Sequence, residues 1–263
     1  MTTMPPSQQL VSPSHRLPDQ AEISTMQKTG YLVVPGFFDR AETRALVDWT
    51  GEIAARPEVA GGQMVYHEDS LLAPGHRVVQ RIEDFCSHHP AMDGLARKGA
   101  LTRWLNRLMG GDTLLFKDKI NFKYPGGDGF KAHQDQAAGW TRYAPVFVTA
   151  LVTVDAATIE NGCLEIATAP RQQQLIGAEW APLDEESLGL VTVPTQPGDV
   201  IFFDSFVAHA SKPNLTAEPR RVLYLTYNLA EAGDHRSRYF AEKRAAFPPD
   251  IERLPGEVYV FRV

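Results

Sequence analysis

The sequence predicts an α+β protein whose core is a double-stranded β-helix (jelly roll) flanked by N-terminal helices. Apolar residues recur at helical spacing before Gly111. After it, short runs of Val, Ile, Phe, Thr and Tyr alternate with Gly, Pro, Asn and Asp. A chain of 263 residues, 43% of them hydrophobic, is long enough to bury a sizeable core. Helices followed by many short strands favour a single α+β domain.

The N-terminal part is predicted to contain a tail and two helices. Residues 1–18 are polar and Pro-containing, and we expect them to form a flexible tail before a single domain over residues 19–263. Asp39 and Glu42 form a capping-box pattern at the start of the first helix. The second helix is expected over residues 89–109, where a Gly-Gly pair ends it.

The jelly-roll core is predicted between about residues 112 and 230. Strand and turn signals recur there at the spacing typical of a sandwich or barrel. The segments are LLFKDKINFKYPGG (114–127), VFVTALVTVD (146–155), ENGCLEIA (160–167), GLVTVPTQPGDVIFFD (189–204) and RRVLYLTYN (220–228). The charged, Pro-rich segment 237–263 is expected to wrap around the outside of the domain.

Charge and hydropathy exclude several classes of partner. The net charge of −6 argues against a nucleic-acid surface, and no apolar run is long enough to span a bilayer. No secretory signal is visible, so we expect a cytoplasmic protein in which Cys86 and Cys163 are reduced thiols. The expected partner is a small-molecule substrate, and the sequence does not determine the oligomeric state.

A candidate metal site lies in FKAHQDQAAGW, where His133 and Asp135 are separated by one residue. On a strand these two side chains point the same way, and His209 follows a later predicted strand. Two imidazoles and a carboxylate form the facial triad of non-haem iron(II) oxygenases. A second HxD pattern, His67 to Asp69, lies between the helical segments without a strand pattern. We therefore interpret it as a surface His-Asp pair.

Arg220 begins the strand after His209 and adds specificity to this pattern. A guanidinium binds a carboxylate at two points, as a bound keto acid such as 2-oxoglutarate would require. Arg221 should point to the opposite face. Two other readings stay open, a non-redox metal-binding jelly roll (an isomerase or binding protein) and a catalytically silent scaffold. Arg220 argues against the former and the intact triad against the latter.

Several further residues have both a structural and a functional interpretation. Lys117, Lys119, Asn121 and Lys123 alternate with mainly apolar residues. They form either an exposed strand face or a cationic wall beside the metal for an anionic cosubstrate or substrate, and Asn121 and Lys123, nearest the HQD stretch, are the better candidates for such contacts. Trp140 and Tyr143 follow the HQD stretch and either pack in the core or contact a cationic group of the substrate. Arg81 and Glu83 are interpreted as a surface ion pair, with a substrate contact as the alternative.

Three segments resemble the phytanoyl-CoA dioxygenase family of iron(II)/2-oxoglutarate oxygenases: NFKYPGGDGFKAHQDQAAGW, VTALVTVDAATIENGCLEIA and PGDVIFFDSFVAHASKPNLTAEPRRVLYLTYN. The resemblance implies Fe(II), 2-oxoglutarate and dioxygen as cofactors and cosubstrates, with ascorbate as the in vitro reductant. By resemblance, the iron ligands are His133, Asp135 and His209, Arg220 holds the distal carboxylate of 2-oxoglutarate, and Ser211 and Thr149 add hydroxyls to that pocket.

The resemblance also carries expectations about the reaction. A carboxylate at Asp135, where halogenating members have Ala or Gly, implies hydroxylation of an unactivated C–H bond. Pro170 stands where a histidine is common in the family, which leaves the substrate lip undetermined.

FKDKINFKYPGG, HQDQAAGW and KRAAFPPDIERLPGEVYVFRV are most similar to the branch that includes 2-aminoethylphosphonate dioxygenases. We therefore expect a small polar or zwitterionic substrate, an aminoalkylphosphonate being the leading candidate. Its phosphonate would meet Lys117, Lys119 or Asn121, and its ammonium would face Tyr143, Trp140 or an acidic residue. The alternative is an oxygenase that tailors a natural product or an amino-acid derivative.

Overall fold

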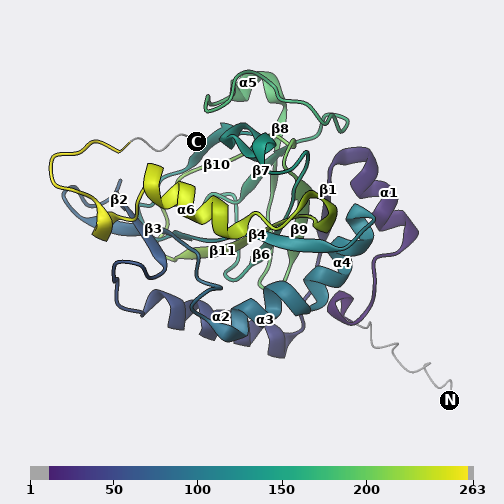
Figure 1. Ribbon diagram of the computed structural model, residues 1–263, viewed down its shortest axis with the longest axis horizontal. Coiled ribbons are helices and arrows are strands. Elements are labelled where there is room, and N and C mark those ends of the chain that lie inside the picture. Colours follow the sequence, from purple (N-terminus) through teal and green to yellow (C-terminus); the bar gives the residue numbers. More distant parts are fainter. Residues whose placement is uncertain (1–11, 260–263) are drawn as a thin grey trace, which may run out of the picture.

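Two antiparallel β-sheets form the core of the protein (Figure 1), in a computed structural model that describes residues 12–259. The larger sheet has seven strands in the order β1-β9-β6-β11-β4-β3-β2, and the smaller has four in the order β5-β10-β7-β8. Helices α2 and α3 lie on the side of the larger sheet away from β7, β8 and β10 (Figure 1). This arrangement is the predicted jelly roll with flanking N-terminal helices.

The elements have the following bounds. The helices are α1 (Gln20–Thr29), α2 (Arg40–Ala54), α3 (Pro90–Lys98), α4 (Ala100–Met109), α5 (Glu185–Leu188) and α6 (Arg236–Ala246). The strands are β1 (Tyr31–Val34), β2 (Met64–Asp69), β3 (Arg77–Glu83), β4 (Thr113–Lys123), β5 (Phe130–His133), β6 (Val148–Thr153), β7 (Leu164–Ala167), β8 (Leu190–Val193), β9 (Val200–Asp204), β10 (His209–Ser211) and β11 (Arg220–Leu229). No helix in this part of the chain is long and apolar enough to cross a membrane.

The two faces of β4 have different environments. Ile120 and Phe122 belong to the main hydrophobic cluster, which also includes Leu46 of α2 and Trp104 of α4. The alternate residues point into the space between the sheets, where Lys123 Nζ lies 2.8 Å from the Ser211 hydroxyl of the smaller sheet. The lysine-bearing face of this strand is therefore an interior wall of the jelly roll and not an exposed surface.

The helices follow local sequence signals, with one break. The predicted capping box is present at α2, where Glu42 N donates to Asp39 at 2.9 Å and Asp39 N donates to Glu42 at 2.8 Å. The predicted helix over residues 89–109 is instead two helices, because Gly99 has an extended backbone conformation between them. Helix α1 was not predicted, although Asp19 and Glu22 form a second capping box.

Three further segments differ from the sequence expectations. Strands β2 and β3 extend the larger sheet outside residues 112–230, and β2 carries His67 on a strand that no alternation pattern indicated. Strand β1 also lies outside this range, within GYLVVPGFFD (30–39), where a strand was expected from the resemblance of this segment to the family's entry strand. The segment from residue 237 was expected to wrap the exterior, but its first ten residues belong to α6, which contributes to a cavity wall. Cys86 and Cys163 are buried free thiols, as predicted. Residues 1–11 of the predicted tail lie outside the described residues.

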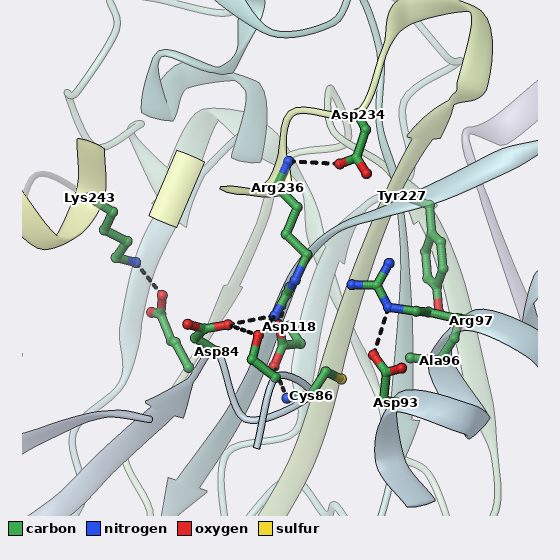
Figure 2. A network of polar contacts seen from close by, with 12 residues as sticks. Asp84, Cys86, Asp93, Ala96, Arg97, Asp118, Tyr227, Asp234, Arg236 and Lys243 are labelled. Carbon is green, nitrogen blue, oxygen red and sulfur yellow. Dashed lines mark hydrogen bonds and ion pairs between the residues drawn. The ribbon is translucent and has the colours of Figure 1, made fainter. Parts of the chain in front are cut away.

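A buried ion network attaches α6 to the larger sheet (Figure 2). Arg236, in the first turn of α6, donates to Asp118 of β4 and, at 2.7 Å, to Asp84 after β3. Asp118 is completely buried, and its second oxygen accepts a hydrogen bond from Cys86 N at 2.9 Å. Because charges out of water require partners of this kind, the network determines where α6 sits against the sheet.

Candidate metal and cosubstrate site

Three predicted ligands meet at the open end of the jelly roll. His133 ends β5, Asp135 begins the short 3-10 turn Asp135–Ala138, and His209 begins β10, where it pairs with His133 in register. Gln134 is extended between the first two, so their side chains point the same way although the strand has ended. Ligand atoms of all three residues lie within 4.8 Å of one another.

Backbone contacts orient both imidazoles toward a common point. His133 Nδ1 lies 2.7 Å from the carbonyl oxygen of Lys131, and His209 Nδ1 lies 3.0 Å from that of Val207. A ring nitrogen facing a carbonyl must carry the proton, which leaves Nε2 with its lone pair available for a metal. His133 Nε2 lies 3.7 Å from Asp135 Oδ1, so the free nitrogen and the carboxylate share one site.

The protonation states also suit a metal site. Burial and the nearby His133 lower the pKa of His209 to about 4, so its imidazole is neutral at physiological pH. Burial alone would raise the pKa of Asp135, but the hydrogen bond with His133 and the interaction with His209 hold it well below its usual range. A neutral imidazole and an ionised carboxylate are the forms that bind iron(II).

A second group of polar residues lies deeper between the sheets, around Arg220. Arg220 is buried, donates to the Gly162 carbonyl at 2.7 Å and leaves its Nε without a hydrogen-bond partner among the described residues. Lys123 lies directly opposite it on β4 and is also buried. Burial and the neighbouring Arg220 lower the pKa of Lys123 to about 6. Two adjacent buried basic side chains without a carboxylate partner favour the binding of an anion.

The other predicted cosubstrate residues differ in position. Ser211 is close to this pair, because its hydroxyl lies 2.8 Å from Lys123 Nζ. Thr149 is buried on β6, and its hydroxyl is bonded to that of Thr226 at 2.9 Å. With Asn121, Lys123 was the better candidate of the lysine-bearing face for contacting an anionic cosubstrate or substrate, and it lies opposite Arg220. Arg221 points away, as predicted, and forms a bidentate pair with Asp155.

A cavity of about 570 Å³ opens beside the triad. His133 and Asp135 form one side of it, and Lys117, Lys119, Trp140 and Tyr143 are among the residues that line the rest. Asn121 is buried on the same face of β4, with its side-chain oxygen unpaired among the described residues. Two of the three predicted metal ligands and four of the five predicted substrate residues therefore line one cavity.

The cavity wall includes residues whose role the sequence did not indicate. Arg81 and Glu83 are a buried pair, 2.8 Å apart, and not the surface pair expected. Lys243 of α6 also binds Glu83. Burial would raise the pKa of Glu83, but Lys243 and Lys117 hold it well below its usual range. These contacts join segments distant in the sequence, and short-range patterns cannot reveal them.

The loop after β7 closes one edge of the cavity. Gln134 is buried and attaches this loop, since its side chain donates to the Gln174 carbonyl at 3.1 Å and accepts from Ile176 N at 2.6 Å. Trp180 of the same loop lines the cavity in a left-handed backbone conformation. Gly139 lies beneath its ring, and a Cβ there would come within 2.8 Å of the indole. Pro170, which stands where the family commonly has a histidine, therefore lies in the loop that closes one edge of the cavity.

The alternative HxD pattern has a structural explanation. His67 lies between Glu58, at 3.3 Å, and Asp250, at 3.4 Å, and Arg77 also binds Asp250 at 2.7 Å. These contacts connect β2 to the segment after α6. His67 is not among the residues that line the cavity, so the interpretation as an ordinary polar contact is the better one.

Relatives in sequence share nearly the whole chain. A profile of the phytanoyl-CoA dioxygenase (PhyH) family matches residues 26–222. The chain is 34% identical over 254 residues to a 2-aminoethylphosphonate dioxygenase from uncultured bacterium HF130_AEPn_1, covering 91% of this chain and 93% of the relative. It is 38% identical over 241 residues to a methylphosphonate hydroxylase from Gimesia maris, covering 90% of each.

Solved structures confirm the fold. EctD from S. alaskensis, determined with 2-oxoglutarate and 5-hydroxyectoine, matches with a TM-score of 0.69 and 23% identity over 84% of this chain and 78% of that one. The epimerase SnoN from nogalamycin biosynthesis matches with a TM-score of 0.67 and 20% identity over 92% and 96% of the two chains. Together with the profile match, these findings assign the chain to the phytanoyl-CoA dioxygenase family.

Proposed function

We propose that this protein is an iron(II)- and 2-oxoglutarate-dependent dioxygenase that hydroxylates the carbon next to phosphorus in a small phosphonate. The observation that carries the proposal is the common cavity, in which a His-Asp-His triad faces a wall of buried and half-buried lysines. Two relatives that are more than 30% identical over most of the chain are named for phosphonate oxidation. No membrane or nucleic-acid feature competes with a small-molecule substrate.

Iron(II) would be held by His133, Asp135 and His209. The fit rests on the donor set, since two imidazoles whose Nδ1 atoms face carbonyl oxygens and one carboxylate bring their ligand atoms within 4.8 Å of one another. Three protein ligands on one face leave other coordination positions for 2-oxoglutarate and dioxygen. When bound, this centre couples the oxidative decarboxylation of 2-oxoglutarate to the insertion of one oxygen atom into a C–H bond.

The distal carboxylate of 2-oxoglutarate would be held by Arg220, with Lys123 and Ser211 beside it. The unpaired Nε of Arg220 and the like-charged neighbour opposite it both favour a bound anion. Asn121 lies between this group and the cavity wall on the same face of β4, with its own unpaired oxygen. We place Thr149 at the edge of the cosubstrate pocket, where its hydroxyl would be shared with Thr226.

Lys117 and Lys119 would bind the phosphonate. In the described part of the chain, neither ammonium lies within ion-pair distance of a carboxylate. Lys119 instead lies 4.4 Å from the ring centroid of Tyr224, and Lys117 lies 5.4 Å from that of Trp140. Burial and Lys117 lower the pKa of Lys119 to about 7, and a bound anion would favour its charged form. The lysines thereby orient the substrate carbon toward the triad, while Trp140 and Tyr143 exclude water.

A coupled assay tests the proposal. Purified protein with iron(II), 2-oxoglutarate and ascorbate should release succinate when methylphosphonate or another small alkylphosphonate is added. Phosphorus NMR should show one new α-hydroxyphosphonate for each succinate formed. Stimulation by large hydrophobic scaffolds or amino-acid derivatives, with none by phosphonates, would favour natural-product tailoring and leave the iron chemistry standing.

A further inference from the structure

We infer that the cavity selects phosphonates whose organic end carries no ammonium group, so that an alkylphosphonate is a better substrate than an aminoalkylphosphonate of the same size. The inference rests on the proposed function and narrows its substrate class. It begins with the charges around the cavity, where within residues 12–259 the cationic side chains outnumber the carboxylates. The cations are Arg81, Lys117, Lys119, Arg142 and Lys243, and the carboxylates are Glu83, Asp135 and Glu242.

The most deeply buried carboxylate of this wall, outside the triad, is already paired. Glu83 is completely buried. It accepts a hydrogen bond from Arg81 Nε at 2.8 Å and forms an ion pair with Lys243. A substrate ammonium would have to displace one of these two cations from a site without water. Removing a partner from a buried pair is unfavourable, so Glu83 is closed to a second cation.

The carboxylate near the mouth of the cavity is also surrounded by donors. Glu242 accepts from the Tyr143 hydroxyl at 2.6 Å and from Arg238 at 2.7 Å, and Arg142 lies 3.0 Å away. Burial and Glu242 raise the pKa of Tyr143 to about 12, so its hydroxyl stays protonated and continues to donate. Asp135, the third carboxylate, belongs to the triad.

The two aromatic rings that could bind a substrate ammonium, those of Trp140 and Tyr143, already face cationic side chains of the protein. Lys117 Nζ lies 5.4 Å from the ring centroid of Trp140. The guanidinium groups of Arg142 and Arg238 lie 5.0 and 5.1 Å from that of Tyr143. A ring quadrupole already facing a cation offers little to a second one. The ammonium positions expected from the sequence are therefore occupied within the protein itself.

These observations have a common electrostatic consequence. A phosphonate dianion offsets the excess positive charge of the wall, whereas an ammonium on the same molecule adds to it. The ammonium would also lose water without gaining a vacant carboxylate. The cavity therefore discriminates by repulsion at one end of the substrate as well as by attraction at the other.

Propylphosphonate and 2-aminoethylphosphonate form a matched pair for the test, because a methyl group in the first replaces the ammonium of the second. We expect kcat/KM for propylphosphonate, measured by succinate release and phosphorus NMR, to be at least roughly tenfold higher. Calorimetric titration of the metal-free protein should show the same order of affinities. Equal or better turnover of 2-aminoethylphosphonate would overturn the inference and leave phosphonate hydroxylation standing. Turnover of neither compound, nor of methylphosphonate, would overturn the proposed function itself.

A pair of variants tests the electrostatic cause. Lys117→Gln removes one cation from the wall and uncovers Trp140, so the preference for propylphosphonate should shrink at least about threefold. Lys98→Gln removes the same charge from an exposed position on α3 and should leave the preference unchanged. A preference that is equal in both variants would show that charge on the wall is not its origin.

Discussion

Lys123 of β4 and Arg220 of β11 face each other on neighbouring strands as two buried basic side chains. Arg220 Nη2 lies 2.7 Å and Lys123 Nζ 3.4 Å from the same carbonyl oxygen, that of Gly162. In the described part of the chain, no carboxylate lies within ion-pair distance of either one. Like charges placed opposite each other destabilise a sheet, so this pair favours the binding of an anion between the strands.

Binding of 2-oxoglutarate is expected to take up a proton at Lys123. Its pKa of about 6 leaves the amine mostly uncharged at pH 7.5, and a carboxylate beside it raises that pKa, so binding draws a proton from solution. Titration calorimetry of the anaerobic iron(II) protein in buffers of different ionisation enthalpy measures the uptake, which should approach one proton. In Lys123→Met the uptake should vanish, and KM for 2-oxoglutarate should rise roughly tenfold. Equal uptake in the variant would place the proton elsewhere.

The triad variants should separate the two HxD patterns. His133→Ala, Asp135→Ala and His209→Ala should each abolish turnover and lower iron(II) affinity at least about tenfold, because each removes one of three ligands. Iron content and anaerobic iron(II) titration provide the measurement. His67→Ala is the matched control and should keep both iron binding and activity. Loss of iron in the His67 variant alone would contradict the assignment.

Arg220 should determine the affinity for 2-oxoglutarate. A hydrogen bond to a charged group contributes roughly 1.5–3 kcal/mol, so Arg220→Ala should raise KM for 2-oxoglutarate by about one to two decades. Arg220→Lys should recover only part of this, since an ammonium lacks the planar two-point fork. Arg221→Ala is the control, because that side chain binds Asp155 on the opposite face. A larger effect on KM at Arg221 would reverse the assignment of the two arginines.

Lys119 and Asn121 should determine the affinity for the phosphonate. Lys119→Ala removes a half-buried lysine from the cavity wall, and Asn121→Ala removes a side-chain oxygen without a hydrogen-bond partner among the described residues. We therefore expect kcat/KM for the phosphonate to fall at least roughly tenfold in each. The Kd for 2-oxoglutarate should change less in Lys119→Ala than in Arg220→Ala. Unchanged phosphonate KM in both variants would remove β4 from the substrate site.

Arg236 should stabilise both the fold and the substrate site. Removing one partner of a buried ion network costs about 3–5 kcal/mol, so Arg236→Ala should lower the free energy of unfolding in urea by that amount. It should also raise the phosphonate KM, because α6 carries Lys243 to the cavity wall. Arg97→Ala breaks a half-exposed pair with Asp93, also visible in Figure 2, and should cost only about 0.3–0.5 kcal/mol. Similar losses in the two variants would mean that the network is not strongly stabilising.

The sequence predictions succeeded where the interacting residues lie close together in the sequence. The capping box of Asp39 and Glu42 and the paired orientation of His133 and Asp135 depend on neighbours within a few residues, and both were predicted. The split at Gly99 was missed because one glycine between two helical patterns has no marked local signature. Its effect depends on how the two helices pack.

The other missed features depend on contacts distant in the sequence. In the sequence, Arg81 and Glu83 have the appearance of a surface pair. In the structure, Lys243, which is 160 residues away from Glu83, binds Glu83 and helps to cover the pair. The alternation of lysines with apolar residues along β4 indicated that the lysines share one face of the strand. That this face is interior depends on the smaller sheet that covers it. A helix such as α6, whose buried face is largely polar and aromatic, also lacks the apolar periodicity by which helices are recognised.

Trp180 and Gly139 restrict each other in evolution as well as in space. With the indole in place, any side chain at position 139 would collide with it, and the positive φ of Gly139 adds a second cost. Relatives with a larger residue at 139 should therefore have a smaller residue at 180 or a different loop. The two positions should covary, and exchanging this loop between family members should require the glycine to move with it.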